Sequence, residues 1–114
     1  MEIIPAKRLT IHTSEEKRFN HHPLYSAIVE ELHRRGIREV AVTRGIAGFS
    51  EDGPIFTTNI EVLSYNLPIT IEATDTVDKI DSVIALFAEM VDGGVIEVMQ
   101  TRIVGGRPAS GETR

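Results

Sequence analysis

The residues best suited to chemistry are two arginines that occupy matching places in a weak internal repeat. Arg44 lies in the run Thr43-Arg44-Gly45, and Arg102 lies in the run Thr101-Arg102-Ile103, 58 residues later. Both follow a glycine by eight residues, at the end of a stretch that reads as a strand. Two guanidinium groups that converge from neighbouring strands would form a site for a small anion. Two ordinary surface arginines are the alternative, and the residues alone leave both interpretations open.

Glycines and one carboxylate accompany the arginines. Gly45 and Gly48 follow Arg44, and the pair Gly93-Gly94 lies between a helical stretch and the last strand. A tight turn explains the first two, and a helix end explains the second pair. Glu72 lies in an alternating stretch, where its carboxylate would either accept hydrogen bonds from a ligand or be solvated. These residues therefore add to an anion site only if the arginines form one.

The remaining polar residues offer little catalytic or metal chemistry. The chain has no Cys and no nucleophile elbow or metalloprotease motif. His12, His21 and His22 could gather a metal ion, but adjacent histidines do not easily reach one ion from a rigid loop. We therefore expect no metal site and no enzyme. Two alternatives stay open: a small enzyme with His12 and Glu72 on an open sheet face, or a metal-binding trimer.

The net charge and its distribution along the chain argue against nucleic acid as a partner. The chain has 114 residues and a net charge of −5, and all of that charge lies in the second half. Residues 1–57 hold 8 basic and 8 acidic residues, whereas residues 58–114 hold 4 and 9. No basic stripe results, so binding of nucleic acid is not expected. Without a long apolar run or a signal peptide, the chain is expected to be cytoplasmic.

The spacing of apolar residues predicts four strands and two helices. The first helix begins at Pro23 and ends at Gly36, and the second begins after Asp75 or Thr76 and ends at Gly93. A loop covers 45–58, and 59–65 alternates too weakly to be assigned. Residues 1–104 are expected to form one domain, and 105–114 a disordered tail. The four expected strands span 7–13, 39–44, 68–75 and 95–104.

Two strand–helix–strand units in succession predict an α+β fold, the ferredoxin-like βαββαβ sandwich. Right-handed crossovers place both helices on one face of an antiparallel sheet and leave the other face bare. The last strand is apolar on both sides, as its residues Val95, Met99 and Val98 show. Such a strand should lie inside the sheet or at an interface. We therefore expect a homo-oligomer.

Four segments, in this order and spacing, resemble one bacterial and archaeal family. Over residues 6–104 the chain is similar to the family called domain of unknown function 190, among the PII-like signalling proteins. The resemblance implies a trimer that binds small ligands, often adenine nucleotides, in clefts between subunits. It also implies that the 45–58 loop signals to a partner protein. The four segments are Lys7-Arg8-Leu9-Thr10-Ile11, Pro23-Leu24-Tyr25, Arg44-Gly45-Ile46-Ala47-Gly48-Phe49 and Leu67-Pro68-Ile69-Thr70-Ile71-Glu72.

The resemblance also implies which residues hold the ligand, with Arg44 and Arg102 on phosphate and glycine backbone close to it. The Gly93-Gly94 loop lacks the lysine of a PII phosphate cradle, which favours AMP or ADP over a triphosphate. No cofactor is expected. Family members are often encoded near a fluoride channel, so a membrane transporter or channel is a candidate partner. This chain departs from the pattern at His21, where members usually carry a glycine. The implied ligand-binding residues are Arg44, Gly45, Gly48, Phe49, Glu72, Gly93, Gly94 and Arg102.

Overall fold

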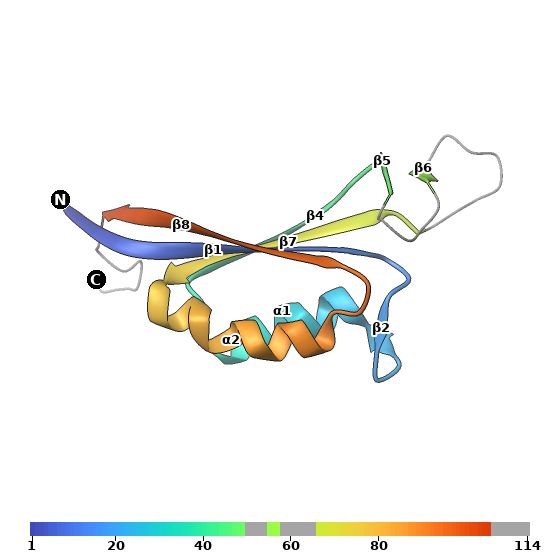
Figure 1. The fold of residues 1–114 in the computed structure, drawn as a ribbon, viewed down its shortest axis with the longest axis horizontal. Helices are drawn as coiled ribbons and strands as arrows, with labels where there is room; N and C mark the ends of the chain where they lie inside the picture. The colour runs from blue at the N-terminus through green and yellow to red at the C-terminus, as the bar shows by residue number, and fades with distance from the viewer. Residues whose placement is uncertain (50–54, 58–65, 106–114) are drawn as a thin grey trace, which may run out of the picture.

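The computed structural model describes residues 1–49, 55–57 and 66–105. Strands β4, β7, β1 and β8 form one antiparallel sheet in that order, and both helices lie on one of its faces (Figure 1). The predicted α+β fold is therefore confirmed. The elements are β1 Glu2–Ser14, β2 Arg18–Phe19, β3 His22–Pro23, α1 Leu24–Arg34, β4 Glu39–Arg44, β5 Ala47–Gly48, β6 Phe56–Thr57, β7 Pro68–Thr76, α2 Val77–Met90 and β8 Val95–Gly105.

The hydrophobic core fills the space between the sheet and the helices. Alternate residues of the central strands β1 and β7 point into it, and Leu9, Ile11 and Ile71 are each at most 1% exposed. Each helix faces the sheet with one stripe of apolar residues, because positions three and four apart share a side of a helix. The fully buried residues of the two stripes are Leu24, Ile28, Leu32, Ile80, Val83 and Phe87.

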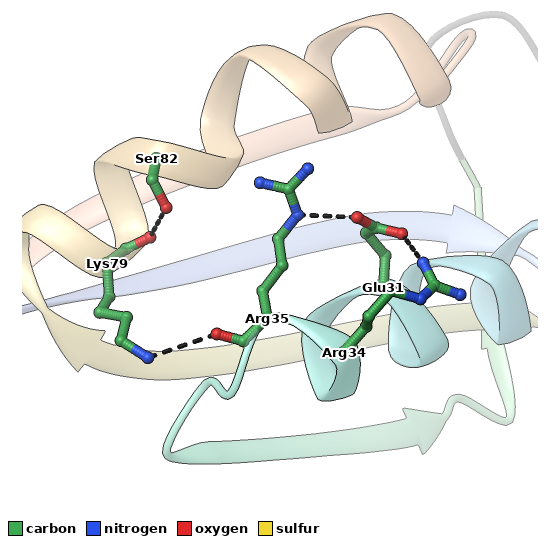
Figure 2. Close-up of polar contacts among 5 residues, drawn as sticks. All are labelled: Glu31, Arg34, Arg35, Lys79 and Ser82. Carbon is green, nitrogen blue, oxygen red and sulfur yellow. Dashed lines mark hydrogen bonds and ion pairs between the residues drawn. The ribbon is translucent and has the colours of Figure 1, made fainter.

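The end of α1 and the start of α2 lie where the sequence predicts, whereas α2 ends at Met90, before the predicted stop at Gly93. Thr76 precedes α2, and its hydroxyl accepts a hydrogen bond from the backbone N–H of Lys79 at 3.4 Å. Gly36 follows α1 with a φ of 71°, a left-handed conformation that suits glycine. The Lys79 ammonium donates to the carbonyl oxygen of Arg35 at 3.3 Å (Figure 2) and to that of Gly36 at 3.1 Å. The first turn of α2 therefore holds the end of α1.

An ion pair inside α1 lies beside this contact. Arg35 Nε donates to one carboxylate oxygen of Glu31 at 2.7 Å, and Arg34 Nη1 donates to the other (Figure 2). The hydrogen bond from Arg35 is the main cause that lowers the pKa of Glu31 below its usual value. The charges of both arginines act in the same direction. The last turn of α1 is thus held by exposed charges.

Strand β1 begins at Glu2, five residues before the predicted start at Lys7. The missed segment, 2–5, does not alternate and contains Pro5. It pairs only with residues 102–105 of β8, beyond the end of β7. We call this two-stranded extension the ribbon; it continues past the helices (Figure 1). A segment that lies outside the helix-covered part of a sheet has no buried face to impose alternation.

Residues 14–22, which lie between the predicted first strand and first helix, contain a small hairpin. Phe19 of β2 pairs with His22 of β3, and the two residues between them, Asn20 and His21, have φ values of 50° and 68°. Two successive left-handed residues are typical of the tight turn that fits a two-residue hairpin. Asparagine accepts this conformation more readily than histidine does. The position where the chain departs from the family's glycine is therefore a left-handed one.

Strand β8 lies at the edge of the sheet, so the alternative that placed it inside the sheet is wrong. Its apolar side chains are nevertheless open to solvent: Val95, Val98, Met99 and Val104 are 41–61% exposed. An interface with another subunit stays a prediction for this strand. Gly105, predicted as the first residue of the tail 105–114, is the last residue of β8. The undecided segment 59–65 and residues 106–114 lie outside the described residues.

Candidate functional site

Apart from Glu72, the predicted ligand residues lie at two opposite ends of the sheet. The loop end is where β4 stops and where β7 and β8 start, and it holds Arg44 and the two glycine pairs. The ribbon end is where β1 starts and β8 stops, and it holds Arg102. Figure 1 shows the two ends on opposite sides of the helical layer.

At the loop end the chain leaves β4 and folds back over Pro68. The backbone N–H of Gly45 donates to the carbonyl oxygen of Pro68 at 2.8 Å. A Cβ atom placed on Gly45 or Gly48 would lie 3.1 Å from Pro68 Cγ, closer than most such contacts. The next strands, β5 and β6, pair through Gly48 and Phe56. Packing against Pro68 thus gives both glycines a structural role, and their backbone still lies beside Arg44.

Arg44 itself forms an ion pair with a residue that the sequence did not indicate. Its Nη2 atom lies 2.8 Å from Oε2 of Glu15, just after β1. The Arg44 side chain is 59% exposed, whereas the Glu15 side chain is 19% exposed. Glu15 belongs to a polar loop with no periodicity, so only the pairing of β1 with β7 brings it to this place. Arg44 therefore keeps one side of its guanidinium open to solvent.

Gly93 and Gly94 lie at the same end of the sheet and are held by the fold. Gly93 has a φ of 78° in the turn after α2. A Cβ atom on Gly94 would lie 2.5 Å from the carbonyl oxygen of His12 and 2.8 Å from a methyl group of Val91. Side chains do not approach backbone so closely. The turn between α2 and β8 therefore requires both glycines, as the helix-end interpretation predicts.

At the ribbon end Arg102 lies in an open groove of about 1090 Å³. Lys7 is a second cation in this groove, and its ammonium is 2.6 Å from Oδ1 of Asp81 on α2. The Arg102 side chain has no hydrogen bond or ion pair to any residue that the structure describes. Sequence reasoning missed Lys7 as a candidate, although Lys7 and Arg102 lie near each other in the β1–β8 register. The groove is lined by Ile3, Pro5, Ala6, Lys7, Val77, Gln100, Thr101, Arg102 and Val104.

The two arginines do not converge within one subunit. The prediction that they lie on neighbouring strands is therefore wrong. Arg44 is on β4 and Arg102 on β8, and these strands are the two edges of the sheet. Arg44 pairs with Ile69 of β7, and Ile69 pairs in turn with Thr13 of β1. Arg102 pairs with Pro5, which is eight residues earlier in β1 than Thr13. Eight residues of strand span about 27 Å. In a repeated strand–helix–strand fold the equivalent strands of the two halves, here β4 and β8, run antiparallel. Equivalent positions on them, such as Arg44 and Arg102, therefore lie at opposite ends of the sheet.

The two remaining predicted ligand residues, Glu72 and Phe49, lie in different places relative to Arg44. Glu72 pairs with Thr10 and Ala41 on the face without helices, in the middle of β7. It lies four residues from Pro68, about 13 Å of strand. Phe49 is 73% exposed beside Gly48. The structure therefore keeps Phe49 at the loop end and separates Glu72 from Arg44.

His12, the centre of the alternative enzyme site, pairs with a different carboxylate from the one expected. Its Nε2 atom lies 3.1 Å from Oε1 of Glu97 on β8, and about half of each side chain is exposed. Among the described residues no cluster of three or more metal-ligating side chains occurs. Neither helix in this part of the chain is long and apolar enough to span a membrane.

Solved structures and relatives show where this fold belongs. The chain is similar to CPII from Thiomonas intermedia K12, whose structure is described as bound to ADP and bicarbonate, with a TM-score of 0.66, 18% identity and 95% of each chain covered. A putative PII-like signaling protein from Thermus thermophilus matches with a TM-score of 0.64 and 18% identity, over 91% of this chain and 94% of that one. A UPF0166 protein of Methanocaldococcus jannaschii is 31% identical over 91% of this chain and 96% of its own length.

The match to a protein family is equally extensive. A UPF0166 protein of Aquifex aeolicus is 32% identical over 70% of this chain and 76% of its own length. The family model described as "Uncharacterized ACR, COG1993", which is DUF190, matches residues 6–103. These limits enclose the whole sheet apart from the first residues of β1 and the last two of β8. The chain therefore belongs to the DUF190 family, within the PII-like fold.

Proposed function

We propose that this protein is a trimeric PII-like regulator that binds an adenine nucleotide, AMP or ADP, in clefts between its subunits. The observation that supports this most directly is the separation of Arg44 from Arg102. One chain presents an anion-binding residue at each end of the sheet, and neither end is enclosed. A ring of subunits in head-to-tail contact joins the loop end of one to the ribbon end of the next. Three subunits would then build three equal sites.

Each half of such a site contributes different chemistry. The loop end provides the Arg44 guanidinium, which suits a phosphate, and the turn at Gly45 and Gly48, where the absence of side chains leaves room for a ligand. The ribbon end of the neighbouring subunit provides Arg102, with Lys7 in the same groove. Lys7 supplies a cation in place of the lysine that is absent after Gly94. The apolar lining residues Ile3 and Val104, 51% and 61% exposed, offer a surface for a nucleobase.

The proposed role is regulatory and not catalytic. The CPII structures of the same fold are described as bound to ADP, AMP and small acids. In our proposal the nucleotide fixes the 45–58 loop relative to the sheet, and the loop then favours binding of a partner protein. A membrane transporter or channel is the partner class that we propose to test first. The protein would act in the cytoplasm.

Calorimetric titration tests the ligand. AMP, ADP, ATP and cyclic nucleotides are added to protein whose trimeric mass has been confirmed by light scattering. We expect binding of AMP or ADP, and a loss of at least about 10-fold in affinity for Arg44→Ala and for Arg102→Ala, since each removes a charge-assisted hydrogen bond. Arg18→Ala, at an exposed position of β2, serves as the control and should bind normally. If no nucleotide releases heat on a confirmed trimer, the nucleotide proposal is wrong.

Mixed trimers test whether the two arginines meet across an interface. Arg44→Ala and Arg102→Ala chains, carrying different tags, are expressed together and purified through both tags. In a head-to-tail ring that contains both chains, about a third of the interfaces join an intact Arg44 to an intact Arg102 of the neighbouring subunit. We expect ADP binding to return at a corresponding fraction of sites. Sites confined to single subunits would show no recovery at all.

A further inference from the structure

Glu15 occupies the point where three segments of the loop end meet. Its backbone N–H donates to the carbonyl oxygen of Leu67 at 3.0 Å, which extends the β1–β7 ladder by one residue. Its Oε1 accepts a hydrogen bond from the backbone N–H of Leu67 at 3.2 Å. Its Oε2 receives Arg44 Nη2 at 2.8 Å. One carboxylate therefore binds a backbone donor with one oxygen and a guanidinium with the other.

The two groups that Glu15 joins bracket the connection between β4 and β7. Arg44 is the last residue of β4, and Leu67 comes directly before β7. Glu16 adds a contact to the same bracket, because its backbone N–H donates to Oδ1 of Asn66 at 3.0 Å. The Glu15 carboxylate thus touches the residue where the chain leaves the sheet and the residue where it returns.

We propose that Glu15 is an internal competitor for the anion that Arg44 binds, an inference that rests on the proposed function. The carboxylate already occupies one donor of the guanidinium, and a phosphate that approached Arg44 would meet its negative charge. The guanidinium has five N–H donors in a fixed fork, and bidentate binding of a phosphate needs two of them on one edge. A phosphate on that edge displaces the Glu15 oxygen. An ion pair with one half-exposed partner is weak enough to be displaced.

Displacement has a consequence at Leu67. The Glu15 side chain is held at two points, Arg44 and the Leu67 N–H. When an anion takes Arg44, the Leu67 N–H is the only group among the described residues that still holds it. The anion is thereby coupled to the residue at which the connection rejoins the sheet, and the coupling acts equally in both directions. Glu15 sets both the affinity of Arg44 for anions and the response of the loop end to them.

The test compares Glu15→Gln with Glu16→Gln. The first substitution removes the competing charge and keeps an oxygen that can accept from Leu67, so the bracket is preserved. The second removes the same charge from the next residue, whose side chain makes no hydrogen bond or ion pair within the described residues. In calorimetric titrations with ADP we expect Glu15→Gln to bind about 3- to 10-fold more tightly than the natural protein, the range for loss of a partly exposed charge contact. Glu16→Gln should bind like the natural protein.

Equal or weaker ADP binding by Glu15→Gln, with an unchanged melting temperature, overturns the proposal. A tighter binding in both variants overturns it too, since the effect would then be one of net charge. If all three proteins fail to bind ADP, the proposed function fails, and the competition is measured with inorganic pyrophosphate. The NMR signal of the Arg44 Nε–Hε group is followed during that titration. A shift at lower pyrophosphate in Glu15→Gln supports the competition; a shift at the same concentration, or none, overturns it.

Discussion

The loop end and the ribbon end each carry one of the two candidate arginines, but within the described residues only the arginine of the loop end is paired with another side chain of the same chain. At the loop end the chain is constrained by its own backbone: Gly45 donates to Pro68, and Gly94 leaves no room between the turn and His12. Arg44 is paired with Glu15 there. At the ribbon end two strands continue without helical cover, and the Arg102 side chain has no hydrogen bond or ion pair in the part of the chain that the structure describes.

This difference indicates which end is complete in one chain. At the loop end Arg44 is already paired with Glu15 and the Gly45 N–H with the Pro68 carbonyl oxygen, so these contacts are made within one chain. The ribbon end exposes Val104 and Ile3 at 61% and 51% beside the Arg102 guanidinium. Exposed apolar side chains next to a charge of this kind are typical of a surface that another molecule covers. A fixed half and an open half are suited to meet across a subunit boundary.

The largest effect is expected when the open end is changed. Val104→Glu places a charge where we expect the neighbouring subunit to pack, and a trimer carries this change at three interfaces. Loss of a buried valine costs about 1.5–3 kcal/mol per interface, before the cost of the buried charge. Light scattering should show monomers in place of trimers, with the circular dichroism spectrum of the fold retained. Ala88→Glu, on an exposed position of α2, should stay trimeric. A trimeric Val104→Glu protein would place the interface elsewhere.

The next effect is expected at the constrained end, and it should act on the fold itself. Gly94→Ala puts a methyl group 2.5 Å from the His12 carbonyl oxygen, and backbone on both sides must shift. Overpacking of this kind lowers the free energy of unfolding by about 1–3 kcal/mol. Gly48→Ala meets only the ring of Pro68, at 3.1 Å, and should cost less. Urea denaturation measures both. An equal cost for the two variants would contradict the assigned contacts.

The same contrast explains what the sequence could predict. The central strand β7 has one buried face, and alternation located it to within one residue. The edge strand β4 was located at its observed bounds although Val40 is its one part-buried residue. The ribbon has no buried face, and the extension of β1 to Glu2 was therefore missed. The hairpin around Asn20 and His21 was missed because its strands are only two residues long. The asparagine beside Phe19 was the signal that could have found it.

The residues of the candidate site also differ in how far the sequence could predict them. Arg44 and Arg102 were identified from their matching patterns, but the inference that they converge ignored the symmetry of the fold. Matching strands of the two halves become opposite edges, so only a second subunit could bring these residues together. Glu15 and Lys7 carry no pattern of their own. They reach the two ends through the register of β1 with β7 and β8, which single-sequence reasoning does not supply.

The smallest effect is expected from a change of pH, which should weaken the end of α1 nearer the ribbon end and leave the loop end unaffected. Near the ribbon end the last turn of α1 is held by Glu31, Arg34 and Arg35, and Arg35 lowers the pKa of the Glu31 carboxyl. A lowered pKa in the folded state stabilises the protein above the ordinary value of 4.5, and this contribution is lost as the pH falls through the lower folded value. The pair is exposed, so the loss is small.

Glu31→Gln should therefore flatten the fall of the melting temperature below about pH 4.5, whereas Glu30→Gln should leave it unchanged. Glu30 is the matched control because it lies one position earlier on α1 and makes no ion pair within the described residues. Hydrogen exchange gives the spatial readout: acid should lower the protection of the Arg35 and Gly36 amides, relative to their intrinsic exchange rates at each pH, before it lowers that of Gly45. The Gly45 N–H is held by the Pro68 carbonyl oxygen, a contact without a titrating group. Simultaneous exchange at both ends would show that the helical layer and the loop end open as one unit.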